Sequence, residues 1–97
     1  MDQITQDRID DAVKSNEIML FMKGTPAQPQ CGFSARVVGL LDGLVDDYGT
    51  VDVLSDTNVR EGMKQYAQWP TFPQLWVDGQ LIGGCDIVEQ LHETGEL

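Results

Sequence analysis

Runs of apolar residues along this chain alternate with polar stretches rich in glycine and proline, and they predict both strands and helices. IMLFM, residues 18–22, is five apolar residues in a row, which is the pattern of a strand buried on both faces. TVDVL, residues 50–54, is a second short β-like run. QLWVDGQLIG, residues 74–83, is two β-like runs around Asp78-Gly79. An Asp-Gly pair between such runs predicts a tight hairpin.

Helical spacing of apolar residues predicts four helices around these strands. In the second helix apolar residues recur at i, i+1, i+4, i+7 and i+8, which places them on one face. Pro70 ends the third helix, because the residue before a proline is disfavoured in helical conformation. The helices are expected over residues 3–15, from just after Cys31 to about Asp47, from Thr57 to Trp69 at most, and from about Asp86 onward.

The predicted order is helix, strand, helix, strand, helix, strand, strand, helix. The first two strands and their connecting helix make a parallel βαβ unit, and the last two strands make an antiparallel hairpin. We therefore predict an α/β fold of the thioredoxin-like kind, a four-stranded mixed sheet with helices on both faces. Residues 1–97 are expected to form a single domain. A site is expected at residues 23–34, where the first strand ends and the next helix begins.

Composition narrows the classes of function. No apolar run approaches the ~20 residues of a membrane span. With 16 acidic and 6 basic residues the net charge is −10, which disfavours nucleic acid and anionic membrane surfaces as partners. The acidity is otherwise explained by a well-solvated surface. The first 17 residues lack the basic start and apolar stretch of a signal peptide. Two cysteines are too few for a disulfide scaffold, so we expect reduced thiols and a cytoplasmic location.

CGFS, residues 31–34, has one cysteine where redox enzymes carry Cys-x-x-Cys, and Ser34 stands in place of the second sulfur. Cys31 precedes a predicted helix, whose unpaired backbone N–H groups and dipole favour a thiolate. Lys23 adds a positive charge nearby and lowers the thiol pKa further. We predict a reactive thiolate at Cys31, with a buried structural cysteine as the alternative. Ser34 has its own simple explanation, a small residue near a helix start.

Two further segments face this site in the predicted fold. In WPTFPQL, residues 69–75, a cis bond before Pro73 would leave the backbone of Phe72 free to pair with an extended peptide. A trans proline in an ordinary loop is the alternative, but the fold context favours cis. In GGCDI, residues 83–87, the glycines allow a close approach, the helix start offers N–H groups to a carboxylate, and Asp86 offers a partner for an ammonium group.

These features have simpler alternatives. GGCDI is also compatible with a plain turn in which Asp86 caps the helix. Arg60 and Lys64 lie four residues apart and share a helix face, either as a solvated pair or as a clamp for a carboxylate. Together the segments suit a small extended peptide with a carboxylate at each end and an ammonium group. Glutathione has that form.

KGTPAQPQCGFS, WPTFPQLWVDG and GGCDI, in this order and spacing, resemble the monothiol, CGFS-type glutaredoxins over residues 18–92. The longer loop between Gly24 and Cys31 distinguishes this pattern from dithiol glutaredoxins. The resemblance implies a thioredoxin-like fold that binds glutathione and has Cys31 as its redox-active residue. The positions that match the glutathione-binding residues are Lys23, Arg60, Thr71, Phe72 (through its backbone), Cys85 and Asp86.

The resemblance also implies a [2Fe–2S] cluster assembled between two subunits, BolA-type partner proteins and apo iron–sulfur proteins as recipients. Such a cluster takes four thiolates, here two Cys31 residues and two glutathione thiols. Ser34 then removes a sulfur that would close a disulfide onto Cys31. The alternative function is a glutathione-dependent thiol–disulfide oxidoreductase that uses Cys31 alone, with Cys85 as a resolving thiol. A redox-insensitive thioredoxin-fold adaptor is a third.

Overall fold

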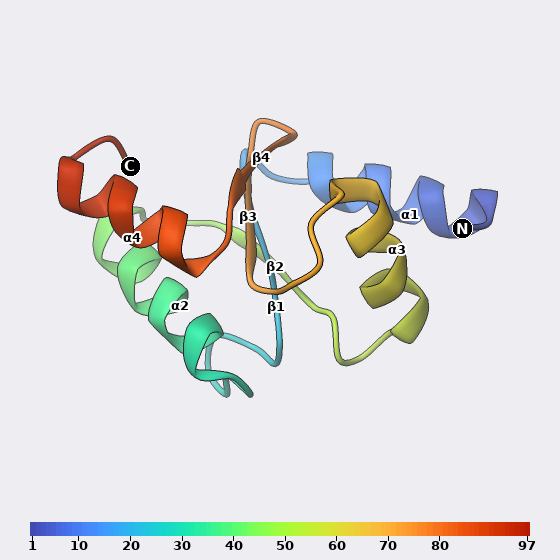
Figure 1. Cartoon of the computed structure of the whole chain (residues 1–97), viewed down its shortest axis with the longest axis horizontal. Coiled ribbons are helices and arrows are strands. Elements are labelled where there is room, and N and C mark those ends of the chain that lie inside the picture. Colours follow the sequence, from blue (N-terminus) through green and yellow to red (C-terminus); the bar gives the residue numbers. More distant parts are fainter.

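Four strands form one sheet in the order β2-β1-β3-β4 in the computed structural model, which describes residues 1–97 (Figure 1). The strands are β1 (Ile18–Met22), β2 (Gly49–Asp52), β3 (Gln74–Val77) and β4 (Gln80–Gly83). β1 pairs in parallel with β2 and antiparallel with β3, and β3 pairs antiparallel with β4. The parallel βαβ unit and the hairpin predicted from the sequence are both confirmed.

The helices cover the sheet in pairs. α1 (Gln3–Lys14) and α3 (Thr57–Ala67) pack together on one face, and α2 (Gly32–Leu44) and α4 (Cys85–Thr94) pack together on the other. This arrangement confirms the predicted thioredoxin-like fold. It brings the start of α2 and the start of α4 to the same face of the sheet, and both lie next to the site described below.

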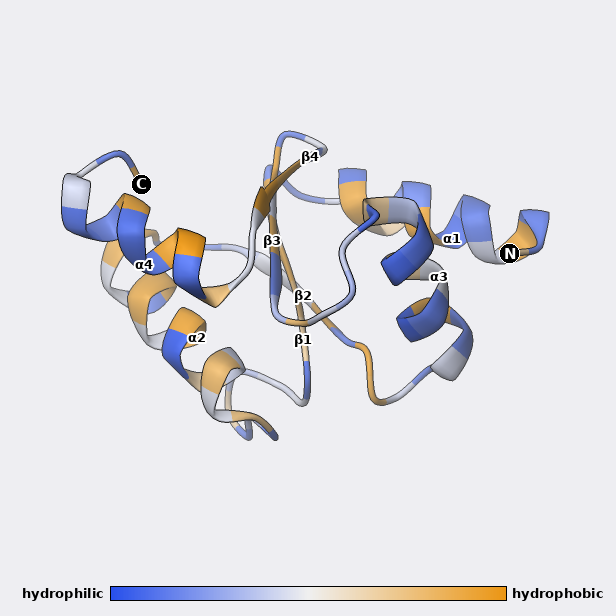
Figure 2. Cartoon of the chain, viewed as in Figure 1, coloured by the Kyte–Doolittle hydropathy of each residue, from blue (hydrophilic) through white to orange (hydrophobic).

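β1 is apolar throughout because each of its faces lies against a different helix pair. Met19 and Phe21 belong to the apolar cluster beneath α1 and α3. Leu20 and Met22 belong to the second cluster, beneath α2 and α4. Figure 2 shows β1 as apolar and the helices as alternating between apolar and polar segments. A central strand between two cores therefore fixes the position of its last residues, from which the site begins.

Three predicted boundaries differ from the structure: the end of α2 by three residues, the end of β2 by two and the start of α4 by one. α2 ends at Leu44 rather than near Asp47, because Val45 turns to extended backbone with φ −132° and ψ 151°. A glycine in the last turn and two aspartates after it disfavour continuation, since acidic groups oppose the dipole at a helix C-terminus. α4 begins at Cys85 with Gly84 as its N-cap, so the alternative in which Asp86 caps this helix is excluded.

The second predicted strand also ends early. β2 stops at Asp52 instead of Leu54, because Asp52 begins a turn. Its carbonyl accepts from Ser55, and its carboxylate accepts from the backbone N–H of Leu54 at 2.9 Å. The backbone N–H of Val53 still donates to the carbonyl of Met22 at 2.9 Å, so pairing with β1 ends where this turn bends the chain away.

The helices are all short or polar on one side. None combines the length and the apolar character that crossing a membrane requires.

Candidate functional site

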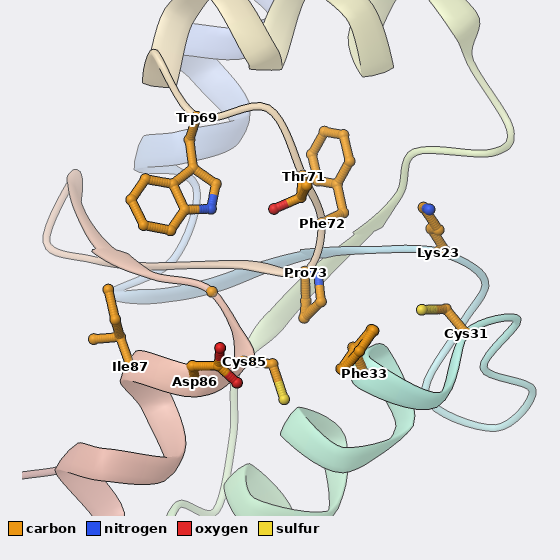
Figure 3. A pocket seen from close by; sticks show the side chains of 11 residues that line it. Lys23, Cys31, Phe33, Trp69, Thr71, Phe72, Pro73, Cys85, Asp86 and Ile87 are labelled. Atoms are coloured by element: carbon orange, nitrogen blue, oxygen red, sulfur yellow. The ribbon is translucent and has the colours of Figure 1, made fainter.

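A cavity of about 540 Å³ opens where the end of β1, the start of α2, the segment before β3 and the start of α4 meet (Figure 3). Most residues predicted for the site share its wall, although they come from four separate parts of the chain. The wall consists of Lys23, Cys31, Phe33, Trp69, Thr71, Phe72, Pro73, Gly84, Cys85, Asp86 and Ile87.

Cys31 is the N-cap residue of α2. As a thiol it makes no capping hydrogen bond, but the backbone N–H of Ser34 lies where it stabilises a negative charge on the sulfur. This effect is the largest of those that lower the pKa of the Cys31 thiol, and it outweighs partial burial, which raises it. The N–H of Phe33, the charge of Lys23 and the Ser34 hydroxyl lower the pKa further. The position therefore favours a thiolate, as helix N-termini do.

Ser34 is fully buried, and its Oγ accepts a hydrogen bond from the backbone N–H of Lys23 at 3.2 Å. The hydroxyl therefore joins the end of β1 to the first turn of α2. Sequence reasoning treated Ser34 either as a missing sulfur or as a small residue, and it missed this bond. The signal was weak, because the two residues are eleven positions apart.

Asp52 fixes the loop that leads to Cys31. Its Oδ1 accepts from the backbone N–H of Gly24 at 2.9 Å, across 28 positions of sequence. The carbonyl of Lys23 in turn accepts from the N–H of Gln30 at 2.9 Å. Gly24 has φ +88°, and a Cβ there would lie 2.5 Å from the carbonyl oxygen of Gln28, so only glycine fits this closed loop.

The segment before β3 forms the opposite wall. The bond between Phe72 and Pro73 is cis, as predicted, and the backbone N–H and C=O of Phe72 make no hydrogen bond to the rest of the backbone. Gln74, which is fully buried, supports the segment by donating to the carbonyls of Trp69 and Thr71, both at 3.3 Å. The wall thus offers backbone groups to an extended ligand from a rigid support.

Trp69 contributes a donor that sequence reasoning missed. Its indole Nε1 is buried and has no hydrogen-bond partner, and Figure 3 shows the nitrogen turned toward the middle of the cavity. A buried donor without a partner is costly, and a ligand acceptor would satisfy it. The tryptophan was noted only as the residue before the helix-ending proline.

The third wall is the start of α4. The N-cap residue Gly84 supplies no side-chain hydrogen bond, so the first N–H groups of the helix are free for a ligand. Asp86 is exposed in the first turn, and its carboxylate points into the cavity in Figure 3. Cys85 is buried, and its Sγ donates to Glu89 Oε1 at 3.2 Å. Burial first, and then Glu89, raises the pKa of the Cys85 thiol to about 11.

Arg60 is the one predicted site residue outside this wall. It lies on α3 with a buried Nε that has no partner. Lys64, for which a solvated pair and a clamp with Arg60 were the two alternatives, pairs with Glu61 at 3.0 Å. The structure therefore does not assemble a two-cation clamp at the cavity, and a contact between Arg60 and a ligand stays a prediction.

The cavity combines a thiolate position with donors and a carboxylate spaced along an extended path.

The family model for glutaredoxin matches residues 18–82 of the chain. Monothiol glutaredoxin-S11 of rice (Oryza sativa subsp. japonica) is 54% identical over 90 residues, which are 93% of this chain and 18% of that protein. The probable monothiol glutaredoxin 2 of Rickettsia typhi is 51% identical over 89 residues, 92% of this chain and 80% of that protein. The chain thus spans most of the bacterial relative but less than a fifth of the rice protein.

Solved structures give the same fold. The solution structure of reduced poplar apo GrxS14 has a TM-score of 0.81 at 45% identity and covers 94% of this chain and 84% of its own. The crystal structure of a buckwheat glutaredoxin–glutathione complex has a TM-score of 0.84 at 28% identity. The match covers 98% of this chain and 84% of the buckwheat chain. From its family model, its relatives and its single CGFS motif at 31–34, this chain belongs to the glutaredoxin family and is of the monothiol type.

Proposed function

We propose that this chain binds glutathione in the cavity beside Cys31 and carries a [2Fe–2S] cluster between two copies of itself. The four cluster ligands would be two Cys31 thiolates and two glutathione thiols. The observation that carries the proposal is the position of Cys31. Its sulfur is favoured as a thiolate at the wall of a ligand-sized cavity, with a hydroxyl rather than a sulfur three residues away.

The wall suits the tripeptide group by group. Lys23 and the start of α4 offer positive charge and N–H donors to the two carboxylates. The free backbone of Phe72 can pair with the extended peptide, and the unpaired Nε1 of Trp69 can donate to one of its oxygens. Asp86 offers a carboxylate to the ammonium group. A related glutaredoxin from buckwheat was solved as a glutathione complex, which supports this part of the proposal.

Cluster ligation by two chains is proposed because one chain has too few cysteine thiolates to bind the cluster alone. A [2Fe–2S] cluster takes four thiolates, whereas this chain has two cysteines, and burial raises the pKa of the Cys85 thiol to about 11. No group of three or more His, Cys, Asp and Glu side chains converges into a metal site, so ligands would have to come from several molecules. Phe33, 62% exposed beside Cys31, offers an apolar contact for a second copy.

Delivery is the last part of the proposal. Ligation by a diffusible tripeptide is exchangeable, which suits transfer to apo iron–sulfur proteins. BolA-type proteins as partners and a cytoplasmic location belong to the same proposal and rest on the family resemblance.

The alternative function, a glutathione-dependent oxidoreductase, is favoured by the lowered pKa of Cys31. Its thiolate would attack a protein–glutathione disulfide, release the protein thiol, and be freed by a second glutathione as oxidised glutathione forms.

The deciding experiment is anaerobic reconstitution of the chain with iron, sulfide and glutathione. We expect visible absorbance, about one cluster per two chains as the geometry of four thiolates requires, and loss of both in Cys31→Ser without loss of fold by circular dichroism. Equal iron content in Cys31→Ser and in the native chain would contradict the proposal. A colourless chain that turns over a glutathionylated peptide would favour the oxidoreductase instead.

A further inference from the structure

We propose that Glu89 is a positioning residue that keeps the Cys85 thiol bonded and protonated, so that Cys31 is the single reactive sulfur of the cavity. Cys85 lines the same cavity as Cys31. Its Sγ donates to Glu89 Oε1 at 3.2 Å, and the same oxygen accepts from Arg36 Nη1 at 2.9 Å. Only the consequence for cluster binding rests on the proposed function, since the bonded thiol is a property of the chain alone.

The three residues form a line from the cavity to the surface. Cys85 is the first residue of α4 and Glu89 follows one turn later, so both lie on the same helix face. Arg36 reaches Glu89 from α2. Cys85 is only 8% exposed and belongs to the apolar cluster beneath these helices, whereas the Arg36 side chain is 63% exposed. The hydrogen-bonded chain therefore links an exposed guanidinium group to a buried sulfur.

The direction of the hydrogen bond is set by the charge on Glu89. Arg36 holds the pKa of the Glu89 carboxyl below its usual range, and the bond from Cys85 lowers it further. An ionised carboxylate only accepts hydrogen bonds, so the sulfur has to supply the proton. Ionising Cys85 would remove this bond and place two negative charges next to each other.

Other charges near Cys85 act in both directions. Asp86, on the same helix, opposes ionisation of the thiol, as Glu89 does, while Arg36 from α2 favours it. Lys23 and Cys31 line the same cavity, but neither is bonded to Cys85. The cluster that buries Cys85 consists of apolar residues from β1, β3, α2 and α4. Burial and Glu89 outweigh Arg36, and the pKa of the Cys85 thiol is raised to about 11.

The thiolate, not the thiol, is the nucleophile and the metal ligand. A second thiolate in the cavity would compete with Cys31 for iron and for mixed disulfides with glutathione. Ser34 removes one such competitor by substitution. Glu89 keeps the second competitor, Cys85, in its unreactive thiol form, and the sulfur still packs against α2.

The test is alkylation by iodoacetamide on the iron-free and glutathione-free chain, read at each cysteine by mass spectrometry from pH 7 to pH 11. Glu89→Gln keeps the volume and removes the charge, so the pH midpoint for Cys85 should fall and its rate at pH 8 should rise about tenfold for each unit of pKa. Arg36→Met removes the one favourable charge, so Cys85 should react more slowly than in the native chain. Asp47→Asn, at an exposed aspartate beyond the end of α2, makes the same change in net charge and should alter nothing.

Three results would overturn the proposal. The first is a Cys85 midpoint that Glu89→Gln leaves unchanged. The second is a higher rate at all pH values with the same midpoint, which would mean loosened packing rather than ionisation. The third is an equal acceleration in Asp47→Asn. Because neither iron nor glutathione is present, a failure here is distinct from a failure of cluster binding.

Discussion

The backbone N–H of Lys23 donates to Ser34 Oγ at 3.2 Å. Two residues that sequence reasoning assigned to separate roles, a charge near the thiol and an absent sulfur, are therefore partners in one bond. The bond fixes the end of β1 against the start of α2. A hydroxyl at this position supports the geometry that lowers the pKa of Cys31 and is not only the absence of a resolving thiol.

Ser34→Ala should destabilise the chain and make Cys31 less reactive. The change leaves the Lys23 N–H without its acceptor, which costs about 1–2 kcal/mol of the free energy of unfolding, and it removes one of the groups that favour the Cys31 thiolate. Urea unfolding measures the first effect and the pH dependence of Cys31 alkylation measures the second. An unchanged alkylation midpoint would mean that the backbone N–H groups alone set the thiol pKa.

Ser34→Cys should produce a disulfide between residues 31 and 34 on oxidation, because it restores the Cys-x-x-Cys spacing. We expect disulfide-reductase activity to rise while cluster retention falls. Peptide mapping of the oxidised variant under non-reducing conditions checks the pairing. If no such disulfide forms, the side chain at the buried position 34 stays turned toward the backbone of Lys23 and does not reach Cys31.

Cys85 should make the fold less stable as the pH rises from about 8.5, the pKa of a thiol in an unfolded chain, to about 11, its value in the fold. In this range the unfolded chain has released the proton and the folded chain still holds it, so unfolding becomes more favourable with increasing pH. Urea unfolding of the native chain and of Cys85→Ser at pH 8 and pH 10.5 isolates the effect. The raised pKa values of Tyr48 and Tyr66 act in the same direction and are common to both chains.

Two results would count against this prediction. Equal loss of stability in the native chain and in Cys85→Ser would assign the effect to the tyrosines. A native chain that gains stability above pH 9 would contradict the prediction, because the lowered pKa of Cys31 adds stability only as the pH rises toward about 8.5, the pKa of an unfolded thiol.

Asp52→Ala should loosen the loop before Cys31. The carboxylate of Asp52 accepts from the N–H groups of both Gly24 and Leu54 at 2.9 Å, and each lost bond costs about 1 kcal/mol. We expect faster amide hydrogen exchange at these two residues, while strand β3 keeps its protection. Asp47→Ala, an exposed aspartate with no recorded bond, is the control. Identical exchange in both variants would show that the loop closes without Asp52.

Asp86→Ala should weaken glutathione binding by about tenfold or more. It removes the carboxylate that faces the cavity, and a charge-assisted hydrogen bond of this kind is worth roughly 1.5–3 kcal/mol. Cys85→Ser keeps the backbone N–H at the start of α4 and should change the affinity little. Calorimetric titration of the two variants with glutathione compares them directly. A larger loss in Cys85→Ser would mean that the two roles are reversed.

The fold was predictable because its signals are local. The apolar run of β1 and the Asp78-Gly79 turn each specify their element within a few residues. The errors fall at boundaries where one residue decides, as at Val45 and Asp52. There the end of an element depends on a hydrogen bond or a backbone angle that periodicity does not contain.

The site was predictable only in part, for the same reason. Cys31 and Asp86 stand at helix starts, which the sequence marks clearly. The unpaired indole N–H of Trp69 is apparent only once the fold buries it beside the cavity. Glu89 follows Cys85 by one helical turn, but its second partner, Arg36, comes from another helix. Arg60 was suggested both by its spacing from Lys64 and by the family resemblance, but it does not line the cavity.

The two tryptophans of the chain lie in separate environments, and this makes its intrinsic fluorescence informative at two places. Trp76 is buried in the core and lies tilted against Tyr66, with ring centroids 5.7 Å apart. Trp69 belongs to the cavity wall, with its indole N–H turned inward. Emission from Trp69 should respond to whatever occupies the cavity, while emission from Trp76 follows the integrity of the core. With Trp69→Phe as a blank, one unlabelled sample separates ligand occupancy from unfolding.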